Sequence, residues 1–302
     1  MTTILKLGSH GLVVFDWQNT LDRLGYPTKA DGNFGPRTEK TTIQFQHDHG
    51  LKADGEVGPS TLSAVDRPPG PEIVSPDLFD TSLRFIQASG YTRVSVPRFV
   101  NLFIVHVMEA RQGSNTAEAV GAWFAKPQSP VSPPPPGFAP KASAHAGFDR
   151  DSGVQYVLPR DVAWGAPGAN SNGYHVEHAG YSAELDADWA SPDNGAMLRL
   201  SAQHAAKAAQ HFGFELRRLS LDEVAVCTRD ALIRKGVLHG QLSGSRGGIC
   251  GHFDSTRVYQ DWKHYGLPNP KTMGFWPDHT DPGAHFPFER YLELARATPT
   301  GA

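Results

Sequence analysis

The stretch NLFIVHVM, residues 101–108, is almost continuously apolar. A strand that is covered on both faces needs apolar side chains at consecutive positions, whereas a half-exposed strand alternates between apolar and polar residues. The stretch therefore predicts a central β-strand of a sheet with both faces covered. His106 is its polar exception. A polar side chain at the end of such a strand faces the carboxyl edge of the sheet, where active sites of α/β folds tend to lie.

Segments further along the chain predict the other strands of this sheet and the helices that cover it. Residues 116–126 (TAEAVGAWFAK) have helical spacing, and residues 191–213 open with Ser and Asp, which cap helices, and continue as a long helix. Three other segments resemble strands: ASAHAGFD (142–149), GVQYVLP (153–159) and YHVEHAGY (174–181). Strands mixed with helices in this order predict an α/β fold, a mixed sheet flanked by helices.

An internal repeat indicates a different structure near the N-terminus. DGNFGPRT (31–38) and DGEVGPST (54–61) share the pattern D-G-x-[FV]-G-P-x-T, and the second copy starts 23 residues after the first. Asp-Gly and Gly-Pro form turns, and the residues after Pro can open a helix. Before the repeat, apolar residues recur every three to four positions, as on one face of a helix. The pattern predicts a small all-α module of three helices, with these apolar candidates: Val14, Trp17, Leu21, Leu24, Ile43, Phe45 and Leu51.

Two proline-rich segments suggest where the chain divides. DRPPGPEIVSP (66–76) carries four prolines and no periodicity, which is typical of a semi-rigid linker. We therefore expect the helical module at residues 1–66, a linker at residues 67–76 and the α/β domain at residues 77–302. The second proline cluster, residues 127–140, is interpreted as a surface loop of the α/β domain.

Composition narrows the class of protein. The chain has 302 residues, of which 39% are hydrophobic and 20% charged, with a formal net charge of −3. A nucleic-acid-binding protein would normally carry a basic surplus, so this class is disfavoured. No apolar run is long enough to span a membrane. The first 17 residues lack the apolar core of a signal peptide, and we expect synthesis in a cytoplasm. Cys227 and Cys250 are expected to be reduced thiols, with a single disulfide as the alternative, and the protein is expected to be a monomer.

The candidate catalytic residues gather around DHTDPGAHFPFERYL, residues 278–292, where two aspartates and two histidines surround a Pro-Gly turn before a short amphipathic helix. Asp281 lies in this turn. His252 follows a short apolar stretch, GGIC, much as His106 ends its strand. Two imidazoles and one carboxylate suit a catalytic zinc, which keeps one position open for water. A structural zinc would need four protein ligands. Spacing alone does not select these three residues.

Residues 5–65 resemble the peptidoglycan-binding module of many bacterial and phage cell-wall hydrolases. The resemblance covers LKLGSHGLVVFDWQNTLDRLGY and both copies of the repeated turn almost continuously. It implies a three-helix bundle that docks on bacterial cell wall. The alternative is a bundle that only supports the neighbouring domain.

Residues 100–295 resemble the type 2 N-acetylmuramoyl-L-alanine amidases, relatives of the peptidoglycan recognition proteins. The ordered series NLFIVHVMEA, SAH, HVEHAGY, GHFD and DPGAHFP carries the resemblance, and the proline cluster is an unfamiliar insertion. The resemblance implies Zn²⁺ as cofactor, held by His106, His252 and Asp281. It implies that Glu177 is the general base. His279 occupies a position where relatives often have a lysine that stabilises the transition state, and we expect a protonated His279 in this role.

Other residues remain as alternatives. Glu109 could be the base in place of Glu177. Trp164 could line the substrate groove. His145, in SAHAG, matches a family histidine and is interpreted as a packing or supporting residue, with substrate contact as the alternative.

The chain departs from the family pattern at one pair of positions. Relatives usually read AWHA where this chain reads AWGA, so Gly165 lacks a histidine that is thought to contact substrate. His175 replaces a small residue, and alternation along a strand puts it on the same face as Glu177. We hypothesise that His175 fills the gap beside Gly165 and contacts substrate.

These features predict a phage-type endolysin that cleaves the amide bond between N-acetylmuramic acid and L-alanine of peptidoglycan. It would be made without a signal peptide and reach the wall through a phage holin, although a prophage or bacterial origin stays open. One alternative is a zinc endopeptidase of the stem peptide; many of these use an H-x-H metal pair, here found only at His47–His49. The other is a non-catalytic peptidoglycan recognition protein.

Overall fold

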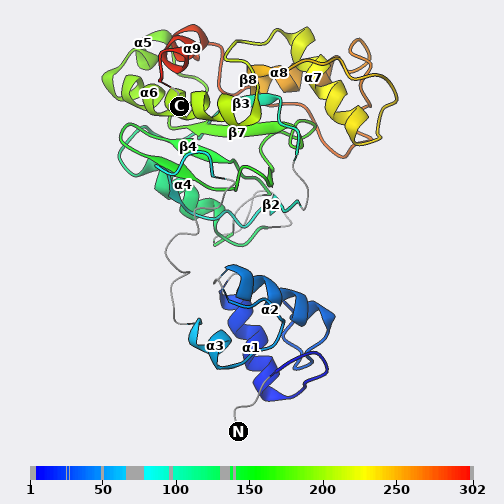
Figure 1. Ribbon diagram of the computed structural model, residues 1–302. Helices are drawn as coiled ribbons and strands as arrows, with labels where there is room; N and C mark the ends of the chain where they lie inside the picture. The colour runs from blue at the N-terminus through cyan, green and yellow to red at the C-terminus, as the bar shows by residue number, and fades with distance from the viewer. Residues whose placement is uncertain are drawn as a thin grey trace. The chain divides into compact units, whose positions relative to one another are not determined.

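The chain forms two compact units, Met1–Ser75 and Pro76–Ala302, which we call the N-terminal and C-terminal units (Figure 1). The predicted linker, residues 67–76, lies outside the residues that the structure describes, as do His49 and most of the proline cluster, so those predictions stay predictions. This computed structural model describes residues 5–24, 26, 28–48, 51–65, 78–94, 98–129, 137–138 and 141–299.

The described part of the N-terminal unit is helical, as predicted. A proline opens two of its helices, because the first helical position needs no N–H donor and favours the fixed φ of proline. The helices are α1 (Leu12–Arg23), α2 (Pro36–Asp48) and α3 (Pro59–Ser63).

The core of this unit follows the predicted helical stripe with one exception. Val14, Trp17 and Leu21 are buried in α1, and Phe45 is buried in α2. Ile43, predicted to lie in the core, is 38% exposed, and that prediction is wrong. Its helix buries the face that carries Phe45, and a residue two positions away on a helix points in another direction.

The first copy of the repeated turn closes around the buried side chain of Gln18. Its Oε1 accepts hydrogen bonds from the backbone N–H of Asp31 at 3.0 Å and of Gly32 at 2.8 Å. Its Nε2 donates to Asn33 O and to Thr38 Oγ1, both at 2.9 Å. A buried amide needs such partners, and the turn supplies them.

The second copy repeats this arrangement around Gln46. Its Oε1 accepts from the backbone N–H of Gly55 at 2.8 Å, and its Nε2 donates to Glu56 O at 2.7 Å and Thr61 Oγ1 at 3.1 Å. Gly32 and Gly55 have φ values of 73° and 74°, which favour glycine at both turns. The sequence repeat therefore produces the same set of hydrogen bonds around a buried glutamine twice. We call each of these sets a polar cage.

The C-terminal unit is built on a mixed six-stranded sheet with the order β1-β5-β4-β7-β3-β8. Its pairs are parallel except for β4 with β5. A separate antiparallel pair joins β2 to β6. The strands are β1 (Arg84–Phe85), β2 (Tyr91–Thr92), β3 (Leu102–Val107), β4 (Ala146–Phe148), β5 (Gly153–Gln155), β6 (Val162–Ala163), β7 (Gly173–His178) and β8 (Gly248–Gly251).

Helices cover both faces of this sheet, which confirms the predicted α/β fold (Figure 1). β3 is buried at every position. Phe103 and Val105 pack into one core with α6 and α9, whereas Leu102 and Ile104 pack into another with α7 and α8. The helices are α4 (Thr116–Phe124), α5 (Asp186–Trp189), α6 (Pro192–Phe212), α7 (Leu221–Arg234), α8 (His252–Gln260) and α9 (Phe288–Arg296).

Residues 78–85, for which the sequence suggested no role, are tied to α6 by a buried polar cluster. Asp80 Oδ2 lies 2.8 Å from His204 Nδ1, and Asp80 Oδ1 accepts from Lys207 Nζ and Ser82 Oγ, each at 2.6 Å. Tyr174 Oη contacts the other ring nitrogen of His204 at 2.9 Å. Burial alone would raise the pKa of Asp80, but His204, Lys207 and Ser82 outweigh it and hold that pKa well below 3.8.

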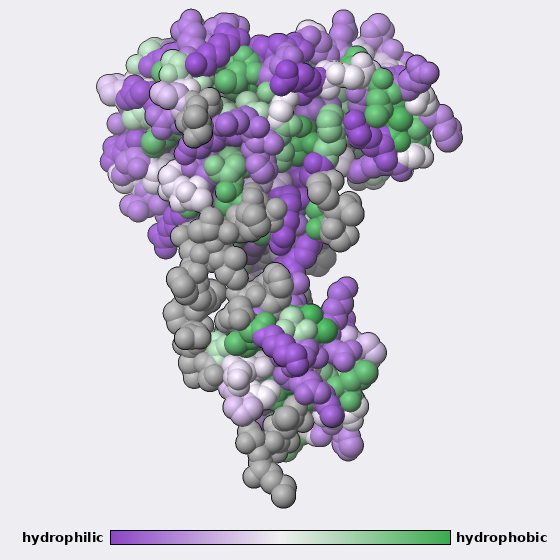
Figure 2. Space-filling view, in the orientation of Figure 1, coloured by the Kyte–Doolittle hydropathy of each residue, from purple (hydrophilic) through white to green (hydrophobic). Residues whose placement is uncertain are grey.

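Hydrophilic side chains cover most of the visible face of the C-terminal unit, with apolar residues in smaller groups between them (Figure 2). None of the helices in the described ranges combines the length and the apolar character needed to cross a membrane.

Candidate metal centre and active site

Neighbouring elements of the sheet bring two of the predicted ligands together. His106 lies near the end of β3, and His252 is the first residue of α8, directly after β8. Since β3 and β8 are parallel neighbours with Val105 opposite Gly251, the next residue of each strand lies at the same edge of the sheet. The loop before α9 places Asp281 beside both.

The three side chains face one another closely. His106 Nδ1 lies 2.9 Å from Asp281 Oδ2, and His252 Nδ1 lies 3.0 Å from Asp281 Oδ1. One candidate ligand atom from each residue lies within 4.8 Å of the others, and no other such cluster of His, Cys, Asp or Glu occurs among the described residues. The two histidines are 2% and 3% exposed. Two imidazole nitrogens directed at one carboxylate form a donor set that fits a zinc ion.

The electrostatics of the cluster suit metal ligands. Burial alone would raise the pKa of Asp281, but its hydrogen bonds and attraction to His106 and His252 hold that pKa far below 3.8. Burial lowers the pKa of His252, although Asp281 opposes this shift. An ionised carboxylate and a neutral imidazole are the protonation states that bind metal.

Glu177 lies next to this cluster on β7. It stands opposite His106 in the parallel pairing of β3 with β7, so the two side chains lie on the same face of the sheet. Burial, followed by repulsion from Asp281 and Glu109, raises the pKa of Glu177 well above 4.5. Its Oε2 is buried and has no hydrogen-bond partner among the described residues. This carboxyl group therefore has both a perturbed proton affinity and a free oxygen.

His279 lies on the other side of His252. The two rings stack with centroids 4.0 Å apart and planes 24° apart, and His279 Nδ1 lies 3.9 Å from Asp281 Oδ1. Burial, followed by repulsion from His252, lowers the pKa of His279. This shift favours the neutral ring at pH 7, in contrast to the protonated ring that we expected from the sequence.

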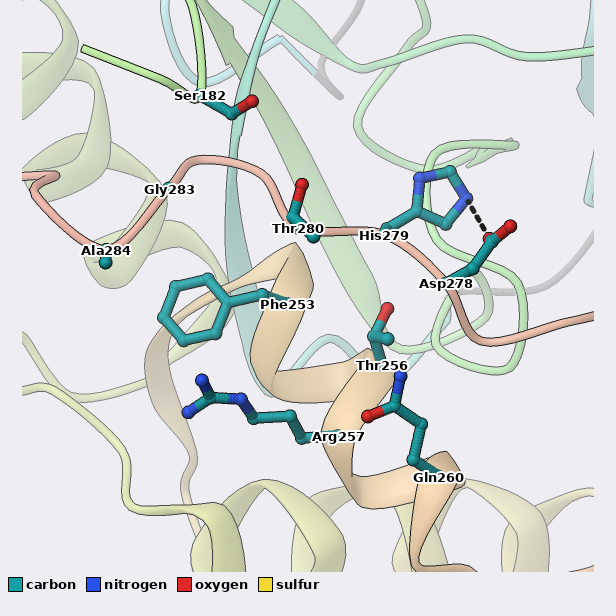
Figure 3. A pocket seen from close by; sticks show the side chains of 10 residues that line it. All are labelled: Ser182, Phe253, Thr256, Arg257, Gln260, Asp278, His279, Thr280, Gly283 and Ala284. Carbon is teal, nitrogen blue, oxygen red and sulfur yellow. Dashed lines mark ion pairs between the residues drawn. The ribbon is translucent and has the colours of Figure 1, made fainter.

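A groove of about 490 Å³ runs beside this residue (Figure 3). Asp278 and His279 lie at one end of it, and Phe253 and Arg257 of α8 lie across from them (Figure 3). The lining residues are Ser182, Phe253, Thr256, Arg257, Gln260, Asp278, His279, Thr280, Gly283 and Ala284. Of these lining residues, His279 is the one that stacks on His252 of the ligand cluster.

The alternative base, Glu109, has a different environment. It is exposed, and its Oε1 accepts a hydrogen bond from the backbone N–H of Ser182 at 2.9 Å. Its φ is 47°, which is unusual for a residue with a side chain. Glu109 thus anchors the loop that follows β7, whereas Oε2 of Glu177 has no hydrogen-bond partner in the described part of the chain.

His145 and His175 are both 0% exposed. A contact of either ring with substrate stays a prediction. His145 Nδ1 accepts the backbone N–H of His175 at 2.9 Å, and the rings stack with centroids 5.5 Å apart. His175 Nδ1 lies 3.1 Å from His106 Nε2. The interpretation of His145 as a supporting residue agrees with these contacts. The link from His175 to His106 has no signal in the sequence, because it depends on which strands are neighbours.

Gly165 and Trp164 lie beside this pair. A Cβ at Gly165 would stand 2.7 Å from Cγ of His175, so the His175 ring does occupy the space next to Gly165. Trp164 is partly exposed, and its Nε1 donates to Thr92 Oγ1 at 2.9 Å. A role for Trp164 in substrate binding stays a prediction.

A second supporting contact, made by Asp254, holds the start of α8. Asp254 Oδ2 accepts the backbone N–H of Gly251 at 2.7 Å and pairs with Arg218 Nη2 at 2.6 Å. An Asp at the third position of a helix is a capping signal that could have indicated the first bond. The pair fixes the helix end that carries His252.

Two family models match the chain. The model described as a putative peptidoglycan binding domain matches residues 11–65, and the model described as N-acetylmuramoyl-L-alanine amidase matches residues 97–284. No curated protein matches.

Solved structures match parts of the chain. A fused zinc-dependent amidase/peptidase/peptidoglycan-binding protein from Clostridium acetobutylicum is 36% identical over 23% of this chain and 31% of its own, with a TM-score of 0.22. The Burkholderia AP3 phage endolysin is 35% identical over 22% of this chain and 25% of its own, with a TM-score of 0.21. This chain thus spans less than a third of either protein.

An AmpD derivative matches a longer part, 71% of this chain and 95% of its own, with 15% identity and a TM-score of 0.39. The amidase model covers more than half of the sequence and includes His106, Glu177, His252 and Asp281. The chain belongs to the N-acetylmuramoyl-L-alanine amidase family.

Proposed function

We propose that this protein is a zinc-dependent peptidoglycan hydrolase that cleaves the amide bond between N-acetylmuramic acid and L-alanine. The observation that carries the proposal is the meeting of His106, His252, Asp281 and Glu177 at one edge of the sheet, in a chain of the amidase family.

His106, His252 and Asp281 would hold the zinc ion. In the structure, Nδ1 of each histidine faces one carboxylate oxygen of Asp281. When bound, zinc polarises a carbonyl and makes water a nucleophile near neutral pH. The three ligands carry a total charge of −1, because one carboxylate is ionised and the two rings are neutral. A bound dication would therefore keep a net positive charge. Such a centre attracts a polar amide and a water molecule.

Glu177 would take the proton of the attacking water and deliver it to the leaving amide nitrogen. Its buried Oε2 has no hydrogen-bond partner within the described ranges and is an available proton acceptor. Its raised pKa makes it a stronger base than an exposed carboxylate. Because Glu177 stands beside His106 on the neighbouring strand, it reaches the same space from one side.

His279 would donate an N–H to the oxygen that gains negative charge in the transition state. Its lowered pKa means that the donor is the neutral ring, held in place by stacking on His252. A neutral donor stabilises an oxyanion less than a cation does, but it does not repel the bound metal.

The N-terminal unit would bind the wall and raise the local substrate concentration for the C-terminal unit. We further propose that the protein is a monomeric phage endolysin, made in the host cytoplasm and released to the wall through a holin. A phage endolysin is among the proteins of known structure that match part of the chain, over 22% of its length.

The test is the identity of the cleaved bond in purified cell walls. Mass spectrometry of the digest should show stem peptides with free L-alanine amino termini and intact glycan strands. New amino termini elsewhere in the stem peptide would make the protein an endopeptidase, and binding without any cleaved product would make it a recognition protein. Either result overturns the proposal. Removal of zinc with a chelator should abolish cleavage, and zinc should restore it.

A further inference from the structure

We propose that His175 is a positioning residue that determines which nitrogen of His106 faces the metal site. The inference rests on the proposed function, because it takes His106, His252 and Asp281 as the zinc ligands. It adds a partner that touches neither metal nor substrate and acts through His106 alone.

The geometry holds His106 at both ring nitrogens. Its Nδ1 lies 2.9 Å from Asp281 Oδ2, on the side of the ligand cluster. Its Nε2, on the opposite side of the ring, lies 3.1 Å from His175 Nδ1. Metal-bound histidines usually donate their second N–H to a neighbouring acceptor, which fixes both the orientation and the tautomer of the ring. His175 is placed to be that acceptor.

The hydrogen bond between His106 Nε2 and His175 Nδ1 also couples the tautomers of the two rings. A neutral imidazole carries one proton. When Nδ1 of His106 binds metal, its proton is on Nε2 and His175 Nδ1 must accept it, so His175 carries its own proton on Nε2. In the metal-free protein, the same two contacts fit the opposite pair of tautomers, in which His106 Nδ1–H donates to Asp281 and His175 Nδ1–H donates to His106 Nε2. Each ring keeps one proton, and metal binding changes the nitrogen that carries it.

The His175 ring is fixed in this position by its surroundings. It stacks on His145 with an interplanar angle of 6°, and its backbone N–H donates to His145 Nδ1. On another side, a Cβ at Gly165 would stand 2.7 Å from its Cγ and 2.8 Å from its Nδ1. Gly165 therefore leaves the space that the ring needs.

A purely structural role explains this histidine poorly. His175 is fully buried, and its Nε2 has no hydrogen-bond partner among the described residues. Burying an unpaired polar atom costs free energy, so an apolar side chain would serve packing better at this position. The contact with His106 gives the polar ring a function that packing does not.

The first test measures zinc affinity of the full chain by competition with a chromophoric chelator. His175→Leu removes the acceptor, and we expect about 10- to 100-fold weaker zinc binding. His175→Asn places its Oδ1 near the position of Nδ1, and it should retain most of the affinity. His204→Leu is the matched control: it removes a fully buried histidine away from the ligands and should leave zinc affinity unchanged.

The second test reads the tautomers directly by ¹⁵N NMR of the histidine rings in the wild-type protein, so it does not depend on the folding of any variant. Both His106 and His175 should carry their proton on Nδ1 without zinc and on Nε2 with zinc. A His175 tautomer that is the same in both states would overturn the inference, as would a His175→Leu variant with wild-type zinc affinity. If the wild-type protein binds no zinc, the proposed function itself fails.

A third measurement tests the pairing with Gly165. Gly165→Ala pushes against the His175 ring and should weaken zinc binding in the wild-type background. In the His175→Ala background the space is free, and the same change should have little effect. Equal effects in both backgrounds would show that the two positions act independently, and would contradict the inferred steric coupling.

Discussion

In the N-terminal unit, Gln18 reaches Thr38 across 20 positions and Gln46 reaches Thr61 across 15, and each glutamine is enclosed by the turn that follows it. In the C-terminal unit, His106 contacts Asp281 across 175 positions, and Glu177 and His252 come from two further elements. The glutamine sites of the N-terminal unit are therefore determined by a short stretch of sequence. The candidate metal centre forms only when the sheet brings its strands together. Its residues contact one another across long sequence separations, which no local sequence pattern predicts.

The largest effect on activity should come from a substitution in the candidate active site of the C-terminal unit. Glu177→Gln removes the proton acceptor while keeping size and shape, and we expect turnover to fall by about 10²- to 10⁴-fold. Zinc content and the unfolding midpoint should stay close to those of the wild type. The rate of release of free L-alanine amino termini from purified walls measures the loss.

Glu109→Gln is the matched control for this change, because Glu109 is an exposed carboxylate bonded to a backbone N–H. We expect it to lower turnover by less than Glu177→Gln does. If Glu109→Gln has the larger effect, Glu109 is the base and the role of Glu177 is wrong.

The fold was largely predictable where patterns are local. The apolar run at residues 101–108 predicted β3, and the Ser-Asp opening of residues 191–213 predicted α6, which begins after a Ser191 cap. The stripe of Val14, Trp17 and Leu21 predicted the buried face of α1. The two-residue strands β1 and β2 had no such signal, because two residues are too few to show a period.

The candidate site was predictable only in part. The residue types suggested zinc, but the choice of His252 and Asp281 needed the resemblance to a family, since their spacing matches no metal-binding loop. The contact of His175 with His106 depends on the register of β3 against β7, which places Ile104 opposite His175 and His106 opposite Glu177. The burial of His145 and His175 depends on the same pairing. The register of paired strands is a property of the folded sheet, and it cannot be predicted from local patterns in one sequence.

A smaller effect should come from the polar cluster that ties residues 78–85 to α6. Asp80→Ala removes the partner of His204 and Lys207, and we expect a loss of about 3 kcal/mol in the free energy of unfolding at pH 7. Asp193→Ala removes an exposed carboxylate that pairs with Arg150, and it should change stability little. Urea unfolding of the three proteins measures the difference. Equal stability of the two variants would contradict the anchoring role of Asp80.

The same pair predicts a pH dependence. Because the folded protein holds the pKa of Asp80 below the ordinary value of 3.8, the ionised carboxylate stabilises the fold at pH values above that ordinary pKa, and fully above about pH 5. This contribution is lost progressively as pH falls from about 5 towards the lowered pKa of the folded state. The stability difference between wild type and Asp80→Ala should therefore shrink between pH 5 and pH 2. A difference that grows on acidification would mean that Asp80 is protonated in the folded protein.

The smallest effects should come from the repeated turns, where the two copies can be compared with each other. Thr38→Val and Thr61→Val each remove one buried hydroxyl that accepts from a glutamine Nε2. A neutral hydrogen bond contributes about 1 kcal/mol, so backbone amides of α1 and α2 should exchange with deuterium roughly fivefold faster. Thr41→Val, which removes a hydroxyl bonded within its own helix, should leave exchange nearly unchanged.

The two threonine variants should also resemble each other, because the cage geometry is the same in both copies. Cleavage of a soluble muropeptide should be unaffected in either variant, since the hydrogen bonds that are lost lie within the N-terminal unit. If one variant loosens its unit and the other does not, the repeated sequence does not encode two equivalent cages. The structure of each repeated turn would then depend on its surroundings, as the metal centre does. The two units would differ less in this respect than the sequence separations of their contacting residues suggest.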